Sequence, residues 1–242
     1  MRALTILSVL PELLDTNGDA ANARVLAQRA RWAGFEATIV PVRSLEDLPG
    51  KVDAIVIGSG NDSDLLAARD LLAPLVNALR AWTTAGVPVL AVGTGWELLS
   101  WGVELADGSV IEGLGLVAGR AVPLPERATD DLVVDSPFGR LVGFENHARS
   151  YAGAEASVLG RVLTGVGNGS KTEGLRMGSF LGTHLHGPVL ARNPGLADHI
   201  LSAAVTRAGG VYVRSERAAA VDAIAEAATA VVVSTLSLTA DS

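Results

Sequence analysis

Residues 90–99 read Leu-Ala-Val-Gly-Thr-Gly-Trp-Glu-Leu-Leu, an apolar run that breaks at two glycines and continues with helix-compatible residues. A buried strand that enters a helix through a tight glycine turn has the layout of a nucleophile elbow. The attacking side chain of an elbow sits at the start of the helix, where the helix dipole lowers the pKa of a thiol. This stretch predicts an α/β fold and marks residues 92–96 as a candidate active-site turn. The alternative is an ordinary strand-to-helix connection.

The chain of 242 residues contains no cysteine, so the candidate turn has no thiol nucleophile. The same absence excludes disulfides and thiolate metal sites, and it favours the cytoplasm as the location. Hydrophobic residues make up 49% of the chain and charged residues 19%, a balance that suits a folded domain with a large core. The net charge of −7, without a cluster of Lys and Arg, argues against a nucleic-acid partner.

Strand and helix signals alternate through the first hundred residues. We expect strands at residues 4–10, 37–42, 54–57 and 87–92, and helices at residues 19–32 and 64–84 and from residue 95. This alternation predicts a three-layer, flavodoxin-like α/β fold, in which helices flank a mostly parallel central sheet. Ligands of such sheets bind beyond the carboxyl ends of the strands, so the loops after Leu10, Ile57 and Val92 are the candidate binding loops.

The second half of the chain has shorter β-like segments between Gly, Pro and Asp turns. We expect these strands at residues 115–117, 121–124, 132–134, 141–144, 161–164 and 179–182, and helices at residues 196–208 and 215–230. The expected organisation is one domain over residues 1–208, with residues 209–242 as a helical extension packed on it. No apolar run reaches the roughly 18–20 residues of a spanning helix, so we expect no membrane span. The apolar start leads into Pro11 and Glu12 without a cleavage site, which favours a first strand over a signal peptide.

Two further loops carry candidate chemistry. In Ile57-Gly58-Ser59-Gly60-Asn61-Asp62 the glycines allow backbone amides to approach a ligand closely, as an oxyanion site requires, although an ordinary turn would look the same. In Gly182-Thr183-His184-Leu185-His186-Gly187-Pro188 the two histidines are two residues apart, so on an extended segment they would point the same way. A general base, a metal site without an evident third ligand, and a structural pair are the alternatives for them.

The order of five segments resembles the class I glutamine amidotransferases. They are residues 10–19 with Asn22, 58–62, 90–99, 141–147, and 182–188 followed by Asn193-Pro194. The resemblance points to the branch that contains cobyric acid synthase and, within it, to the glutaminase subunits of lipid II isoglutaminyl synthases, which amidate peptidoglycan precursors. It covers residues 10 to about 205 and leaves the tail uncovered. It implies glutamine or a similar small molecule as ligand, a Mur-ligase-like partner subunit and no cofactor.

The resemblance assigns roles to single positions. His186 matches the catalytic base, Gly60 and Thr94 match the residues whose amides stabilise the oxyanion, and the family's cysteine falls on Gly93. Contacts with the substrate are implied for Gly58, Gly60, Asn61, Arg127, Asn146 and His147, with residues 143–147 expected as a polar loop. Trp96-Glu97 and His184 depart from the family's usual residues.

Gly93 is the departure that matters most for the chemistry. The family hydrolyses glutamine through a thioester, and glycine has no side chain that attacks an amide. Three hypotheses follow: an amidotransferase-like protein without glutaminase activity; an active amidotransferase or cobyric acid synthase-like subunit in which Gly93 is engineered or bypassed; and a different hydrolase. The hydrolase would use Thr94, Ser59 or Ser63. Thr94 is one position off the apex of the elbow, and its unassisted hydroxyl is a poor nucleophile.

Overall fold

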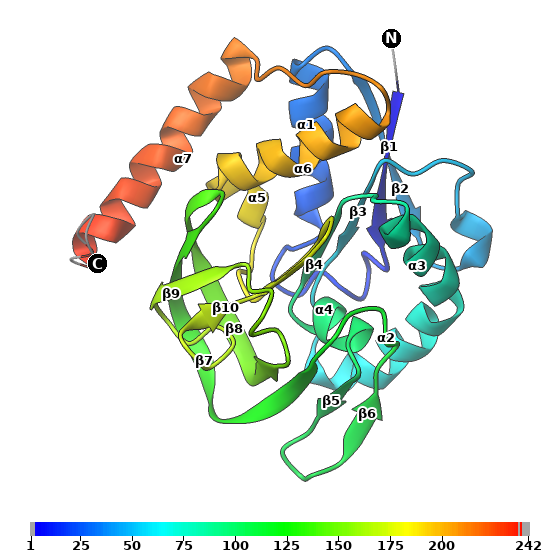
Figure 1. Cartoon of the computed structure of the whole chain (residues 1–242), viewed down its shortest axis with the longest axis vertical. Coiled ribbons are helices and arrows are strands. Elements are labelled where there is room, and N and C mark those ends of the chain that lie inside the picture. Colours follow the sequence, from blue (N-terminus) through cyan, green and yellow to red (C-terminus); the bar gives the residue numbers. More distant parts are fainter. Residues whose placement is uncertain (1–2, 237, 239–242) are drawn as a thin grey trace.

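The computed structural model describes residues 3–236 and 238 of the chain. Its central sheet has the strand order β11-β12-β4-β3-β1-β2 (Figure 1). The strands β1, β2, β3, β4 and β12 are parallel neighbours, and β11 is antiparallel to β12 at one edge. Their bounds are Ala3–Val9 for β1, Glu36–Val42 for β2, Ala54–Ile57 for β3, Val89–Val92 for β4, Leu175–Met177 for β11 and Phe180–Thr183 for β12. The predicted α/β class is confirmed.

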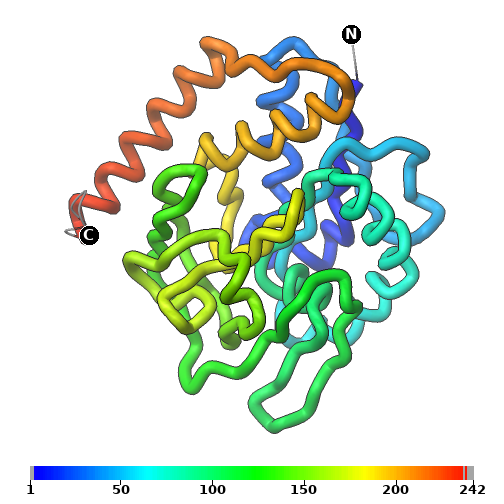
Figure 2. The backbone as a smooth tube through the Cα atoms, viewed as in Figure 1, coloured from blue at the N-terminus to red at the C-terminus, as the bar shows by residue number. Residues whose placement is uncertain are grey.

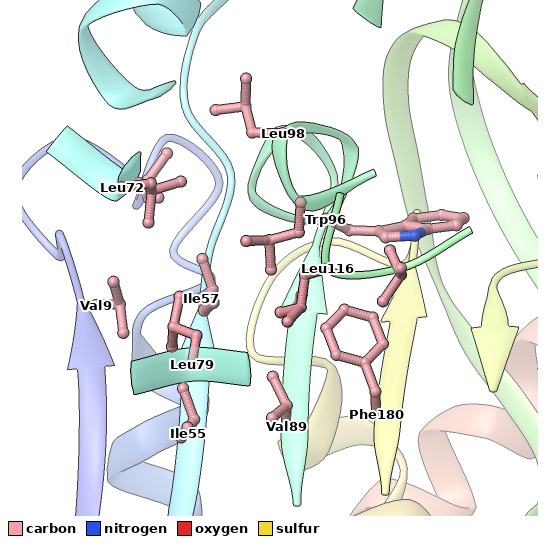
Figure 3. Packing of buried hydrophobic residues seen from close by; sticks show 14 of the residues in the cluster. Val9, Ile55, Ile57, Leu72, Leu79, Val89, Trp96, Leu98, Leu116 and Phe180 are labelled. Atoms are coloured by element: carbon pink, nitrogen blue, oxygen red, sulfur yellow. The ribbon is translucent and has the colours of Figure 1, made fainter. Parts of the chain in front are cut away.

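Helices cover both faces of this sheet because successive strand residues point to opposite sides. In β3, Ala54 and Val56 pack with α1 (Ala21–Trp32) and α6 (Pro194–Arg207). The alternate residues Ile55 and Ile57 pack with α2 (Leu65–Leu72) and α3 (Val76–Thr84), as Figure 3 shows from close by. The short helix α4 (Thr94–Leu99) lies on this second side, with Trp96 and Leu98 in the same cluster.

The helix predicted over residues 64–84 is broken in two. Between α2 and α3 the chain forms a 3-10 turn, Ala73–Leu75, around Pro74. Proline has no N–H to donate and its ring clashes with the preceding turn of an α-helix, so the long helix cannot continue through it. Two further 3-10 turns lie at Leu45–Asp47, after β2, and at Asp62–Asp64, before α2.

The second half of the chain builds a separate sheet, with the order β10-β9-β7-β5-β6 and β8 paired to β7. The strands β7 (Arg120–Ser136) and β8 (Gly139–Ala152) form a long antiparallel hairpin. The smaller strands are β5 (Gly102–Glu104), β6 (Val110–Glu112), β9 (Gly160–Thr164) and β10 (Thr172–Glu173). The short strands predicted at 121–124 and 132–134 are parts of β7, whose register shifts between Pro123 and Ala128, and residues 115–117 form no strand. Proline cannot donate to a strand ladder, which is why one strand looked like two.

The hairpin reaches the carboxyl end of the central sheet. The His186 N–H donates to the Phe144 carbonyl at 2.8 Å, an isolated bridge between β8 and the segment after β12. Residues 143–147 are therefore part of a strand, and the prediction of a polar loop there is wrong. The pairing with β7 holds their side chains in a fixed alternation beside the end of the sheet. After the bridge follow α5 (Val189–Arg192) and α6.

The last helix, α7 (Glu216–Thr235), begins at Ser215, whose hydroxyl accepts the Ala218 N–H. Figure 2 traces the chain from α6 through an irregular linker into α7, at the edge of the molecule. Two arginines hold it: Arg29 binds both oxygens of the buried Asp222 at 2.6 and 3.0 Å, and Arg214 binds the same carboxylate at 2.8 Å. Most other side chains of α7 face outward, among them Ile224, which is 71% exposed.

By length and composition, α7 is the one helix among the described residues that is apolar enough to cross a membrane, with a mean hydropathy of 1.5. Only 11% of its most apolar stretch is buried. The helix is not an uninterrupted apolar run, because Asp222 and Glu226 lie among the Ala and Val residues of 216–235. Length and composition alone do not make a span, and Asp222 of this helix is paired inside the domain.

We expect Asp222→Ala to lower the free energy of unfolding by about 2–4 kcal/mol, because it leaves the buried Arg29 with Asp198 as its remaining carboxylate. Denaturant titration measures this loss. The matched control is Glu226→Ala on the same helix, since Glu226 is exposed and lies 3.8 Å from Arg214. We expect the control to change stability by less than about 0.5 kcal/mol. Equal losses in the two variants would contradict the role of the Arg29–Asp222 pair.

Candidate functional site

A polar cavity of about 130 Å³ lies beyond the carboxyl ends of β3 and β4, beside the segment that follows β12. Every residue of the predicted site except Gly58 lines it. Gly58 instead packs under the loop, where an added Cβ would collide with the Leu14 carbonyl. The lining residues are Thr16, Asn17, Ser59, Gly60, Asn61, Asp62, Gly93, Thr94, Glu97, Arg127, Asn146, His147, Arg149 and His186.

Gly93 is the whole connection between β4 and α4, so the predicted strand–turn–helix geometry is present. Its φ of 49° and ψ of −125° lie in a region that residues with a side chain rarely adopt. The space above it is also occupied. A Cβ on Gly93 would lie 2.6 Å from Ser59 Oγ, 3.0 Å from Ser59 Cβ and 2.7 Å from His186 Cε1. Ser59 therefore fills part of the space that a side chain on residue 93 would need.

Asp19 orients the imidazole of His186. The Nδ1 atom of His186 lies 3.1 Å from Asp19 Oδ2 and 3.1 Å from Asn17 Nδ2, and the Gly187 N–H donates to Asp19 Oδ1 at 2.9 Å. Burial raises the pKa of Asp19, and the contacts with His186 and the Gly187 amide oppose the rise. On the other side of the ring, His186 Nε2 is buried and has no hydrogen-bond partner among the described residues. This is the arrangement of a general base with one nitrogen held and the other free.

The two amides assigned to the oxyanion site are already engaged by hydroxyl groups. The Gly60 N–H donates to Thr94 Oγ1 at 2.6 Å, and the Thr94 N–H donates to Ser59 Oγ at 3.3 Å. The two hydroxyl oxygens lie 3.3 Å apart. A carbonyl oxygen must displace both hydroxyls before it can take both amides, so stabilisation of an oxyanion is blocked in this arrangement.

Paired charges build the wall behind the cavity. Arg149 donates to Glu97 Oε2 at 2.8 Å and to Asp62 Oδ1 at 2.7 Å. Burial disfavours the charged guanidinium, but the two carboxylates outweigh that effect and raise the pKa of Arg149. On the open side, Arg127 donates to Asn146 Oδ1 at 2.8 Å. These contacts fix the lining side chains before any ligand arrives.

His147 and His184 bond to other residues of the chain. Both ring nitrogens of His147 are engaged, Nδ1 at 2.6 Å from the Arg149 carbonyl and Nε2 at 3.1 Å from Glu145 Oε2. His184 stacks on His147 and bonds Glu173, whereas His186 bonds Asp19. The strand β12 ends at Thr183, so the expectation that His184 and His186 point the same way is wrong. Across residues 3–236 and 238, no three His, Asp or Glu side chains gather as metal ligands.

The sequence analysis gave no role to several residues that form the site. Asp19 and Asn17 lie in the segment 10–19, which was noticed only as a motif, and Glu97 was noticed only as a departure. Arg149 and Asp62 were not assigned to the site. In the sequence, Arg149 is 52 residues from Glu97 and 87 residues from Asp62, so no local pattern connects these partners.

We expect Gly93→Ala to destabilise the protein by about 1–3 kcal/mol more than Gly115→Ala, because the added methyl group overpacks against Ser59 and His186. Gly115 is the matched control, since its φ is 59° and an added Cβ would meet nothing within 4 Å. The loss of stability in Gly115→Ala therefore measures backbone strain alone, about 1–3 kcal/mol. Denaturant titrations measure the free energy of unfolding of both variants. Adding Ser59→Gly to Gly93→Ala then measures the coupling energy between positions 59 and 93. We expect Ser59→Gly to recover part of the stability that Gly93→Ala loses beyond Gly115→Ala. Without such a recovery, Ser59 does not occupy this space.

Comparisons with known proteins agree with this geometry. Residues 6–194 match the CobB/CobQ-like glutamine amidotransferase domain. The chain is 33% identical over 214 residues to the GatD subunit of lipid II isoglutaminyl synthase (glutamine-hydrolyzing) from Staphylococcus aureus (strain N315), covering 86% of this chain and 87% of that protein. It is 28% identical to the GatD subunit from Streptococcus pneumoniae (strain ATCC BAA-255 / R6), covering 86% and 82%.

Solved structures share the fold at low sequence identity. A crystal structure of a glutamine amidotransferase has a TM-score of 0.54 and 20% identity, with 82% of this chain and 98% of that chain covered. A chain of PurLQS from Thermotoga maritima has a TM-score of 0.53 and 19% identity, with 86% and 97% covered. The match over residues 6–194 and the GatD relatives together identify the chain as a member of the CobB/CobQ-like glutamine amidotransferase family.

Proposed function

We propose that this protein is a GatD-like subunit that binds glutamine or a similar small molecule without hydrolysing it by the thioester route. The observation that carries the proposal is the crowded elbow: the apex is Gly93, and Ser59 Oγ lies 2.6 Å from the place where a Cβ at that position would be. Peptidoglycan precursor amidation is the favoured context, because both curated relatives belong to lipid II isoglutaminyl synthase.

Thioester hydrolysis of glutamine needs a thiol, a base and an oxyanion site. His186 and Asp19 supply the arrangement of a base. The thiol is missing, and the Gly60 and Thr94 amides are engaged by hydroxyl groups. Two of the three requirements are unmet, whereas the charged and amide side chains that would hold a polar ligand are in place.

We further propose a Mur-ligase-like partner subunit and a cytoplasmic location, both from the likeness to GatD. Residues 209–242 are proposed as an extension of the same domain. Direct threonine catalysis has less support, because the Thr94 hydroxyl is held by the Gly60 amide at 2.6 Å and belongs to the first residue of α4.

Restoring glutamine hydrolysis is expected to need three changes. Gly93→Cys alone leaves the thiol crowded by Ser59 and the amides engaged, so we expect little activity. Ser59→Gly, Gly93→Cys and Thr94→Gly together clear the space and free both amides. Since one oxyanion donor is worth about 100–1,000-fold in rate, we expect the triple variant to exceed Gly93→Cys by at least about 100-fold. Glutamate release, measured with and without a co-expressed Mur-ligase-like subunit, is the assay. Hydrolysis by the unchanged chain would contradict the proposal.

Binding is tested separately by calorimetry and thermal unfolding. Glutamine at about 100 times its dissociation constant should stabilise the unchanged chain by about 2.7 kcal/mol. Arg127→Ala should weaken binding by about 10–100-fold if the guanidinium contacts the ligand. Arg140→Ala, outside the cavity, is the control and should leave binding unchanged. The absence of any glutamine-dependent stabilisation would rule out glutamine as the ligand.

A further inference from the structure

The side chain that fills the elbow is itself a hydroxyl. Ser59 follows β3 directly in the loop and is 4% exposed. The point where a Cβ of residue 93 would lie is 2.6 Å from Ser59 Oγ and 2.7 Å from the His186 ring atom Cε1. A hydroxyl group and the imidazole thus lie on either side of the point where a side chain of residue 93 would begin.

Three hydroxyl groups lie near the elbow, and their contacts distinguish them. Thr94 Oγ1 accepts the Gly60 N–H at 2.6 Å, a short bond that holds it in the loop. Ser63 Oγ is exposed, bonds Asp64 at 3.4 Å and does not line the cavity. Ser59 Oγ makes only two long contacts of 3.3 Å, to the amide and the hydroxyl of Thr94. Of the three, Ser59 is the most easily released from its present bonds.

A base with an unused nitrogen lies beside it. His186 Nε2 is buried and without a partner among the residues that the structure describes, and both His186 and Ser59 line the same cavity. A buried nitrogen of this kind calls for a hydrogen-bond partner. Asp19, which is fully buried, holds the opposite side of the ring. Serine, histidine and aspartate therefore stand in the order of a nucleophile, a base and its orienting group.

We propose that Ser59 is the nucleophile of a second, oxygen-based acyl-transfer activity, with His186 as general base and Asp19 as the positioning residue. This activity goes beyond the proposed function, which concerns glutamine binding and the lost thioester route. The substrate class is a small carboxylic ester, because the cavity measures about 130 Å³. An ester is also cleaved more readily than an amide, because an alkoxide leaves more readily than an amide anion, which matters in a site where the Gly60 amide stays engaged by Thr94.

The reaction balances with water as the only co-reactant. Ser59 Oγ leaves Thr94, gives its proton to His186 Nε2 and bonds the ester carbonyl carbon. The departure frees the Thr94 N–H, which then donates to the carbonyl oxygen. The carbon–oxygen bond to the alcohol breaks, and His186 returns the proton to the leaving oxygen. Water then attacks the acyl-serine with the same base, which releases the acid and restores Ser59. Ser59 and His186 line the same cavity, and Ser59 Oγ and His186 Nε2 have to come within hydrogen-bond distance when substrate binds, since catalytic hydrogen bonds often form only in the substrate complex.

A serine-directed fluorophosphonate tests this assignment on the full chain. We expect one covalent adduct by intact mass, placed on Ser59 by peptide mapping of the unchanged protein, so that the assignment depends on no variant. Ser59→Ala should abolish labelling, and the matched control Ser63→Ala should label at the original rate. His186→Gln should slow labelling by about 100–10,000-fold, the usual contribution of a general base.

Hydrolysis of p-nitrophenyl acetate gives a second readout. We expect the same order of variants in this assay. Thermal unfolding of each variant confirms that it is folded. An adduct on any residue other than Ser59, an adduct that persists in Ser59→Ala, or the absence of labelling would overturn the proposal.

Discussion

The site depends on one steric constraint: a side chain on residue 93 would crowd Ser59 and the His186 ring in the space above the turn after β4, so one of them would have to shift. Gly93 connects strand and helix in a single residue, and Ser59 lies in the loop that follows the neighbouring strand β3. Parallel pairing of β3 with β4 brings the ends of the two strands side by side. Since strand pairing sets this distance, neither loop can withdraw without disturbing the sheet. The chemistry of the elbow is therefore a joint property of two loops that are far apart in the chain.

The alternation of strands and helices was readable from the sequence because each short apolar run, such as Ala54–Ile57, is buried on both faces. The elbow and the residues at strand ends were readable for the same reason, since topology alone puts them at one edge of the sheet. The β7–β8 hairpin was not, because Pro123 interrupts the pattern of a strand that continues past it. The ion pairs inside the site could not be predicted from the sequence either. Glu97 and Arg149 belong to different layers, and periodicity carries no information about which charges meet.

The wall of the cavity keeps the site ordered independently of the residue at position 93. Glu97 and Arg149 are both buried, and a buried charge is tolerable only when it is paired. Arg149 also binds Asp62 on the loop that carries Ser59, so the ion pairs tie the elbow, the hairpin and the loop together. None of these contacts involves the side chain of residue 93. The framework of the pocket and its nucleophile are thus energetically separate.

This separation changes what the missing cysteine means. A void above a buried turn without a side chain would cost free energy, because protein interiors are densely packed. Ser59 and Thr94 remove that void and satisfy the two amides that an absent substrate leaves open. The result is a closed set of contacts in which Gly93, Ser59 and Thr94 fit one another. The composition records only that cysteine is absent. The geometry shows that the three positions form one unit, and a change at any one of them is felt at the other two.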